Sequence, residues 1–306
     1  MKGAILKQLR SSKDIVSGEY LSSALGISRV SVWKHIHKLQ ELGYNILSTA
    51  NGYQLLGSPG IPFPWEFGDR EDSIHYFAEL SSTMDTAKDL ARKNCPDFTV
   101  VIAGRQTAGR GRLNRQWLSE EGGLYFTLVL SPDIPLSASF RINFLASLTL
   151  ARMLRETYGI AADVKWPNDI LVADRKLSGM LSELEGEADR VSFINIGMGI
   201  NVNNDPAGAE TAAISLKKIL GREVSRIELL SRFLDEFEGR LQNLGLETVI
   251  SEWKQYTVTL QRPVRIVTRQ EVTEGLAIDV DDNGALVVEL ADGSTKKIFY
   301  GDCFHQ

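Results

Sequence analysis

The chain has 306 residues, of which 43% are hydrophobic and 24% are charged, and its formal net charge is −5. This length allows two or three domains, and this composition is that of an ordinary globular protein. No apolar run is long enough to cross a bilayer and the start lacks a signal-peptide core, so we expect a cytoplasmic protein without membrane contact. Cys95 and Cys303 are expected to be free thiols, and His35 and His37 are too poorly aligned on a helix to share a metal, so no metal site is expected.

The first 57 residues predict a small basic module. Residues 1–56 contain seven lysines and arginines and three acids, a formal charge of +4 that leaves −9 for the rest of the chain. Apolar spacing predicts three helices and then two strands, which is the pattern of a winged helix-turn-helix that binds DNA. A small helical packing domain is the alternative, which the basic charge disfavours. The candidate DNA contacts lie near the start of the third helix: Ser28, Arg29, Ser31, Trp33 and Lys34.

Two further sections follow this module. The segment Gly57–Pro64 is rich in glycine and proline and predicts a domain boundary. Residues 65–256 alternate predicted strands and predicted helices, which indicates a mixed sheet with helices on one side. The predicted strands are 73–79, 99–103, 124–130, 162–165, 170–173, 177–184 and 191–202, and the predicted helices are 83–94, 140–158 and 226–242. Four short strands separated by turn signals (264–268, 274–280, 285–290 and 295–299) predict a small SH3-like barrel or an appended sheet in residues 257–306. We therefore expect an α+β protein with domains at 1–57, 65–256 and 257–306.

The segment Gly104–Trp117 is the most informative part of the chain. It follows a strand-like run and contains four arginines and three glycines. Glycine lets the backbone approach a ligand closely and arginine offers a fork of donors to a carboxylate or phosphate, so the loop is typical of an anion site. Its glycine spacing matches neither a P-loop nor a dinucleotide fingerprint, and a solvated basic loop is the alternative. Because its like charges repel, we expect bound anions to order it.

Three other segments invite a functional interpretation. Ser82 and Thr83 open a predicted helix, where hydroxyls and backbone amides could hold a small polar ligand or merely cap the helix. Residues 165–169 form a compact turn before Lys176, which is either a partly desolvated cation or a surface lysine. Residues 194–203 are a strand whose glycines allow a ligand or another strand to approach.

Together these motifs resemble biotin protein ligases, and specifically the bacterial form that is also the repressor of the biotin operon. The resemblance covers the whole chain. It is carried by the winged helix-turn-helix and by Gly109-Arg110-Gly111-Arg112-x-x-Arg115-x-Trp117, Lys165-Trp166-Pro167-Asn168-Asp169, Arg175-Lys176-Leu177-x-Gly179 and Gly197-x-Gly199-x-Asn201. It implies a class II synthetase-like catalytic fold that joins biotin to ATP, giving biotinoyl-5′-AMP and pyrophosphate. Biotin then passes to one lysine of the biotin carboxyl carrier domain of acetyl-CoA carboxylase.

The resemblance also implies residue roles. The catalytic cations, which offset the repulsion between the biotin carboxylate and the α-phosphate, are Lys176, Arg112 and Arg110. The implied biotin contacts are Ser82, Thr83, Met84, Gln106, Arg110, Gly111, Arg112 and Lys176. The implied adenylate contacts are Arg115, Trp117, Lys165, Asn168, Asp169 and Asn201. Met84 departs from the family pattern, which commonly has asparagine at this position.

The same resemblance implies cofactors and partners. ATP and biotin are the substrates, and Mg²⁺ accompanies the nucleotide without a dedicated protein site, although Asp169 is a candidate to help hold it or to activate the acceptor lysine. The partners are the carrier domain, operator DNA of biotin genes and, once the adenylate is bound, a second copy of the chain. Two alternative functions stay open: a lipoate or octanoyl protein ligase, and a regulator that only senses biotin.

Overall fold

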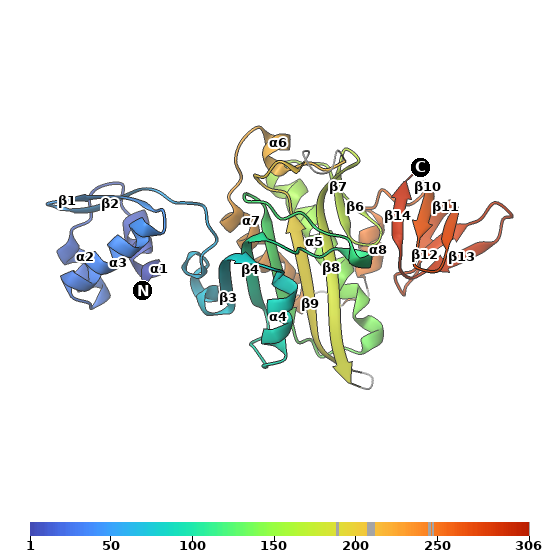
Figure 1. The fold of residues 1–306 in the computed structure, drawn as a ribbon, viewed down its shortest axis with the longest axis horizontal. Helices are drawn as coiled ribbons and strands as arrows, with labels where there is room; N and C mark the ends of the chain where they lie inside the picture. Colours follow the sequence, from blue (N-terminus) through green and yellow to red (C-terminus); the bar gives the residue numbers. More distant parts are fainter. Residues whose placement is uncertain (188–189, 207–211, 244–245, 247, 306) are drawn as a thin grey trace. The chain divides into compact units, whose positions relative to one another are not determined.

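The computed structural model describes residues 1–187, 190–206, 212–243, 246 and 248–305 (Figure 1). Its contacts divide the chain into two compact units, Met1–Ile74 and His75–Gln306. Each unit has its own buried core. No helix among the described residues is both long and apolar enough to span a membrane.

The first unit contains the expected winged helix-turn-helix. Its elements are α1 (Lys2–Arg10), α2 (Gly18–Leu25), α3 (Arg29–Glu41), β1 (Asn45–Thr49) and β2 (Gly52–Gly57). Ser17 and Ser28 cap α2 and α3, because each hydroxyl accepts a hydrogen bond from a backbone amide in the first turn. Gly26 ends α2 in the left-handed conformation, with φ at 64°, which makes the tight turn into α3.

The segment that follows the wing packs on this module. It forms the short 3₁₀ helices Pro64–Glu66 and Gly68–Ser73. The Glu66 carboxylate accepts hydrogen bonds from Tyr44 and Arg10, and the Trp65 indole donates to the Tyr44 hydroxyl at 3.0 Å. The first compact unit therefore extends to Ile74, beyond the boundary that the glycine and proline content suggested.

A seven-stranded sheet forms the centre of the second unit. Its order is β3-β4-β5-β9-β8-β7-β6, and the pairs from β4 to β6 are antiparallel. The strands are β3 (Ile74–Leu80), β4 (Thr99–Gln106), β5 (Leu124–Leu130), β6 (Ala162–Lys165), β7 (Asp169–Val172), β8 (Arg175–Glu187) and β9 (Arg190–Ile200).

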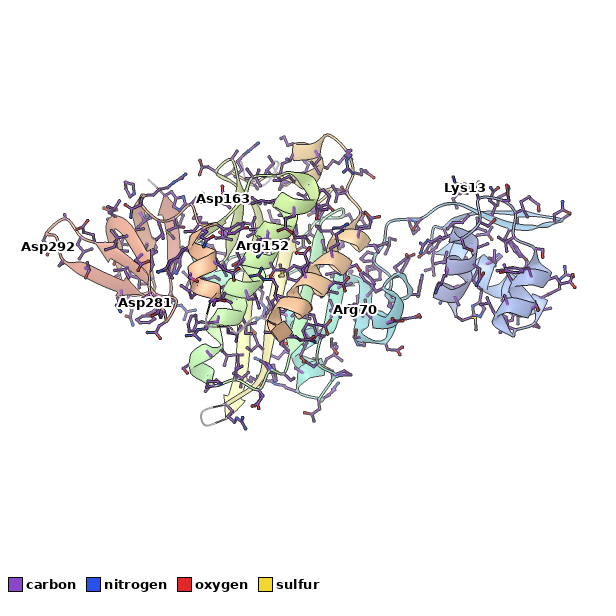
Figure 2. All side chains as sticks on the ribbon, turned by 180° about the vertical axis from the view of Figure 1, so that it is seen from behind. Lys13, Arg70, Arg152, Asp163, Asp281 and Asp292 are labelled. Carbon is purple, nitrogen blue, oxygen red and sulfur yellow. The ribbon has the colours of Figure 1, made fainter. Side chains whose placement is uncertain are left out.

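Helices cover both faces of this sheet, which corrects the expectation of helices on one side. Phe126 of β5 packs edge-on against Phe233 of α7, with ring centroids 5.7 Å apart. The next residue, Thr127, points to the opposite face and donates a hydrogen bond to Thr83 of α4 at 2.8 Å. Figure 2 shows α5, α7 and α8 over one face. The helices are α4 (Thr83–Ala91), α5 (Phe140–Tyr158), α6 (Leu216–Leu220), α7 (Arg226–Asn243) and α8 (Val249–Lys254).

The chain ends in a five-stranded antiparallel sheet of order β13-β12-β11-β10-β14. Sequence patterns predicted four of these strands and missed β14, which pairs with β10 in the register Cys303 to Ile266. Trp166 joins this sheet to the central one, since its indole donates to the Gly284 carbonyl at 3.1 Å. The strands are β10 (Pro263–Val267), β11 (Val272–Val280), β12 (Leu286–Glu289), β13 (Thr295–Ile298) and β14 (Asp302–His305).

Candidate functional site

A pocket of about 550 Å³ opens in the second unit. Its floor includes Gly179, Gly197 and Gly199, which lie on the face of the sheet that α4 covers. Every residue expected to contact biotin lines this pocket, and so does every expected adenylate contact except Asn201. Asn201 is buried, and its side-chain carbonyl accepts a hydrogen bond from Asn204 at 2.9 Å.

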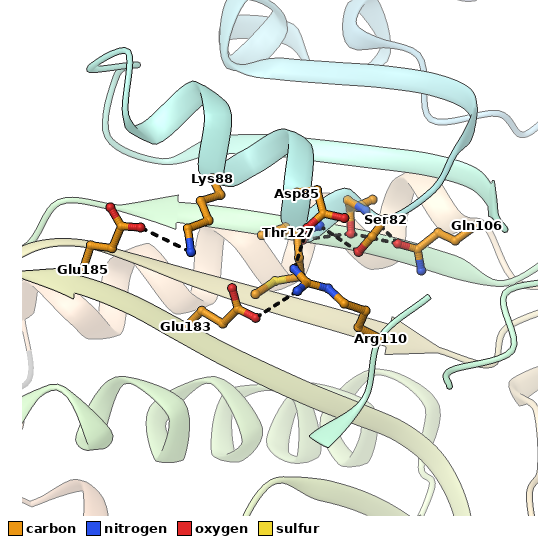
Figure 3. A network of polar contacts seen from close by, with 10 residues as sticks. Ser82, Asp85, Lys88, Gln106, Arg110, Thr127, Glu183 and Glu185 are labelled. Carbon is orange, nitrogen blue, oxygen red and sulfur yellow. Dashed lines mark hydrogen bonds and ion pairs between the residues drawn. The ribbon is translucent and has the colours of Figure 1, made fainter. Parts of the chain in front are cut away.

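Uncharged side chains form one end of the pocket, which we call the neutral end (Ser82, Thr83, Met84 and Gln106). Ser82 and Thr83 are only 1% and 3% exposed. The backbone amide and the hydroxyl of Thr83 both donate to the Gln106 side-chain carbonyl, at 2.8 and 3.1 Å, while the Gln106 amide donates to Ser119 at 2.8 Å. Figure 3 shows the Gln106 side chain beside the start of α4. The orientation of the Gln106 side-chain amide is fixed, because its oxygen accepts from Thr83 and its nitrogen donates to Ser119.

Two strand glycines make room for side chains that shape the pocket. A Cβ atom on Gly197 would lie 2.6 Å from the Met84 sulfur, and one on Gly199 would lie 2.3 Å from Nε1 of Trp117. A Cβ atom on Gly179, the cross-strand neighbour of Gly199, would lie 2.9 Å from the same indole. The glycine pattern of β9 is therefore explained by the close approach of Met84 and Trp117.

Arg110 links α4 to β8 across the neutral end. Its guanidinium lies 2.8 Å from an Asp85 oxygen and 3.4 Å from a Glu183 oxygen (Figure 3). Arg105 likewise pairs with Glu79, at 2.5 Å. The expected repulsion among the loop arginines is thus offset by acids from other segments, which the loop sequence alone did not reveal.

Another part of the pocket is mainly charged, and we call it the charged end (Arg112, Lys165, Asn168, Asp169 and Lys176). Arg112 donates to the Asn168 side-chain oxygen at 3.3 Å and to the Gly301 carbonyl at 2.8 Å. Burial lowers the pKa of its guanidinium from the ordinary value. Arg112 still carries its charge at neutral pH, because an arginine pKa starts so high.

Lys176 and Lys165 supply two ammonium groups at this end. Nζ of Lys176 lies 3.0 Å from an Asp169 oxygen and 5.3 Å from the centroid of the Trp117 ring. Nζ of Lys165 lies 5.9 Å from the Phe304 ring centroid, and within the described part of the chain it forms no ion pair with a carboxylate. Lys165 is therefore a cation available to an incoming anion.

The C-terminal sheet completes the charged end with residues that the sequence did not single out. Arg115 pairs with Asp302 at 2.7 Å. Arg262 pairs with Asp174 at 2.9 Å, and burial lowers the pKa of the neighbouring His305 to about 4. The pocket wall from this sheet consists of Arg262, Asp302, Cys303, Phe304 and His305. Only the pairing of β14 with β10 brings the last four of these residues to the pocket, so no local pattern could have identified them.

The candidate DNA contacts lie on α3 in the first unit. The Ser28 hydroxyl accepts a hydrogen bond from the Ser31 amide at 3.2 Å and therefore caps the helix. Arg29, Trp33 and Lys34 are exposed, whereas Ser31 is half-buried. The exposed set lies opposite the helix face that packs in the core.

Sequence comparisons define the class of protein. Residues 76–201 match the Biotin/lipoate A/B protein ligase family, residues 3–54 match an HTH domain, and residues 259–306 match the Biotin protein ligase C terminal domain. The fold and the pocket thus define a ligase body joined to a helix-turn-helix module.

Individual relatives narrow this class. The Bifunctional ligase/repressor BirA of Bacillus subtilis (strain 168) is 36% identical over 96% of this chain and 94% of its own length. The protein of the same name from Escherichia coli (strain K12) is 29% identical over 94% of this chain and 91% of its own. A solved structure, the biotin protein ligase from Aquifex aeolicus in complex with biotin and ATP, has a TM-score of 0.64 and 28% identity over 76% of this chain and 98% of that one. The chain belongs to the family of bifunctional biotin ligase/repressors.

Proposed function

We propose that the pocket binds biotin at its neutral end and ATP at its charged end, and joins them as biotinoyl-5′-adenylate. One observation carries this assignment. A single pocket contains buried neutral hydrogen-bonding groups at one end and Arg112, Lys165 and Lys176 at the other. A cyclic urea suits the first set, and a polyphosphate suits the second. Catalysis is assigned to residues 65–256, with residues 257–306 completing the pocket.

The charged end would bring two anions together. A carboxylate oxygen of biotin attacks the α-phosphorus of ATP, a new P–O bond forms, and the bond to pyrophosphate breaks. Arg112 and Lys176 are proposed to neutralise the reacting carboxylate and phosphate, since both are held by neighbours before the ligands bind. Arg110 and the Gly111 amide would close over biotin from the loop side.

The remaining pocket residues are proposed to position the nucleotide. Trp117 offers an indole beside the Lys176 ammonium, against which adenine can pack. Asn168 and Lys165 face the phosphates, Arg115 braces the loop through Asp302, and Asn201 supports the strand from behind the pocket wall. The amine of the acceptor lysine would then attack the mixed anhydride and release AMP.

Mg²⁺ would arrive with the nucleotide. Among the described residues no three His, Cys, Asp or Glu side chains are grouped to hold a metal ion. The described acids at the phosphate end are already paired with cations: Asp169 with Lys176, Asp302 with Arg115 and Asp174 with Arg262. This donor set fits an ion held chiefly by phosphate oxygens and water, as Mg²⁺ commonly is.

We further propose that the chain represses biotin genes when the adenylate is bound. The module in residues 1–57 carries an exposed basic helix, and similar full-length proteins are called ligase/repressors. A homodimer with two-fold symmetry would present two copies of α3 to two half-sites of an operator. The carboxyl carrier domain is the proposed protein partner, and the proposed location is the cytoplasm.

Transfer of a labelled acid tests the enzymatic role. The protein is incubated with ATP, a biotin acceptor domain and a lipoyl acceptor domain, and either radiolabelled biotin or radiolabelled lipoate. We expect ATP-dependent labelling of the acceptor lysine by biotin only. Labelling of a lipoyl acceptor domain instead would favour the lipoate ligase, and adenylate binding without transfer would favour a regulator that only senses biotin.

A further inference from the structure

The exposed side of α3 carries apolar side chains that the first unit does not bury. Val32, Ile36 and Leu39 are buried in the core of that unit. Val30 and Trp33, by contrast, are 63% and 55% exposed. Residues three apart are neighbours on a helix surface, so these two form one apolar patch. Packing within the unit does not account for it.

The next turn of the helix holds the Trp33 indole in place. Its ring centroid lies 5.6 Å from that of His37, with the ring planes at 47°. Nδ1 of His37 in turn lies 3.2 Å from a Glu41 oxygen. The patch, which we call the α3 patch (Val30 and Trp33), is therefore braced along the helix by side chains at regular spacing.

Unpaired cations flank the α3 patch. Arg29 and Lys34 are exposed, and neither forms an ion pair with a carboxylate anywhere in the described part of the chain. Lys38, farther along the helix, is paired with Glu41 at 2.9 Å. An apolar patch between unpaired cations, in a module of formal charge +4, complements a polyanion that also presents apolar groups.

We propose that the α3 patch reads thymine methyl groups in the major groove of the operator. This inference rests on the proposed repressor function. Among the groups that base pairs present in the major groove, the thymine C5-methyl is the apolar one. Val30 and Trp33 pack on such methyls, while Arg29 and Lys34 bind phosphates and set the position of α3. The preferred half-site therefore contains thymine at the bases beneath these two side chains.

Uracil substitution isolates this contact whatever the sequence of the operator. Fragments that cover the promoters of the organism's biotin-synthesis genes are amplified with dTTP or with dUTP, and dUTP removes every thymine methyl outside the primer sequences. Binding is measured by gel shift with the full chain, biotin and ATP present. Burial of one methyl-sized group contributes about 0.8 kcal/mol, or about fourfold in affinity. Even a single methyl read in each of two half-sites thus predicts at least about 16-fold weaker binding to the uracil fragment.

Variants on α3 separate a methyl contact from a change in DNA shape. Trp33→Ala and Val30→Ala are expected to bind the thymine fragment more weakly and to prefer it over uracil by a smaller factor. Lys34→Ala is the matched control, because it should weaken binding to both fragments equally. Adenylate formation should be unchanged in all three variants, which shows that the catalytic unit still folds, and an unchanged circular dichroism spectrum should show that the helices of the first unit are retained.

The possible failures are distinguishable. Equal binding of the wild-type chain to thymine and uracil fragments overturns the methyl contact but keeps the repressor function. Full thymine preference in both Trp33→Ala and Val30→Ala overturns its assignment to the α3 patch. Absence of any shift on the thymine fragments, with biotin and ATP present, removes the repressor function and this inference with it.

Discussion

The two ends of the pocket are stabilised differently. At the neutral end, Ser82 and Thr83 are almost fully buried and every partner of Thr83 is uncharged. At the charged end, the side chains of Lys176 and Asp169 are 28% and 24% exposed and pair with each other. Buried neutral hydrogen bonds are rigid and discriminate well between ligands. A partly solvated lysine can leave its carboxylate partner, bind a phosphate of the ligand, and release that phosphate again. Recognition of biotin and chemistry on ATP are thus expected to respond to separate mutations.

The largest effect is expected from Lys176→Met, because it removes an ammonium group beside the reacting phosphate. Biotin-dependent exchange of pyrophosphate into ATP should fall by about 10² to 10³. Lys217→Met is the matched control, since Lys217 pairs with Glu223 at 3.0 Å outside the pocket. A pyrophosphate exchange rate within threefold of the wild-type rate would show that Lys176 does not contribute to adenylate formation.

Gln106→Leu tests the neutral end. The Thr83 amide and hydroxyl lose their common acceptor, so the KM for biotin should rise about 10- to 100-fold while the KM for ATP stays within twofold. Gln242→Leu, on the exposed side of α7, should change neither value. An equal rise in both KM values would show that the two ends do not act separately.

A pair of glycine substitutions sharpens the same comparison. Gly199→Ala forces the rigid indole of Trp117 to move, whereas Gly197→Ala displaces only the flexible end of Met84. Gly199→Ala should therefore raise the KM for ATP by about tenfold, and overpacking of this kind costs about 1 to 3 kcal/mol. Gly197→Ala should affect the KM for biotin, and by less. The reverse pattern in steady-state kinetics would show that ATP binds at the neutral end and biotin at the charged end.

The smallest effect concerns pH. Burial lowers the pKa of His305 to about 4 in the folded chain, from an ordinary value of 6.5. As the pH falls, His305 takes up a proton in the unfolded chain before it does so in the folded chain. The contribution of this group to stability is therefore fully present above pH 6.5 and is lost as the pH drops towards 4. Urea unfolding should show about 1 to 2 kcal/mol less stability at pH 5 than at pH 7 from this group. His305→Asn should reduce that difference, and an unchanged difference would contradict the burial of a neutral imidazole.

The sequence was most informative where structure depends on neighbouring residues. Apolar periodicity predicted the winged helix-turn-helix and all the strands of the central sheet, because local alternation reports which face is buried. The arginine loop, the helix start at Ser82 and Lys176 indeed line one pocket. Which role each pocket residue has stays a proposal.

What sequence patterns missed depends on contacts between distant segments. The Asp85 and Glu183 partners of Arg110 come from α4 and β8, and β14 lies beside β10 through pairing across more than 30 residues. Likewise, Trp65 packs back on Lys2 of α1 and on Tyr44, although glycine and proline content indicated a domain boundary at residues 57–64. Periodicity carries no information on such partners.

The most direct test of the two-ended pocket is to identify the product that the protein makes from a mixture. The protein is incubated with ATP, Mg²⁺ and equal amounts of biotin and lipoate, and the small molecules that it retains are identified by mass spectrometry. The account predicts biotinoyl-5′-AMP in the wild type and in Lys217→Met, and its loss in Lys176→Met. Retention of lipoyl-AMP, or of biotin without any adenylate, would contradict it.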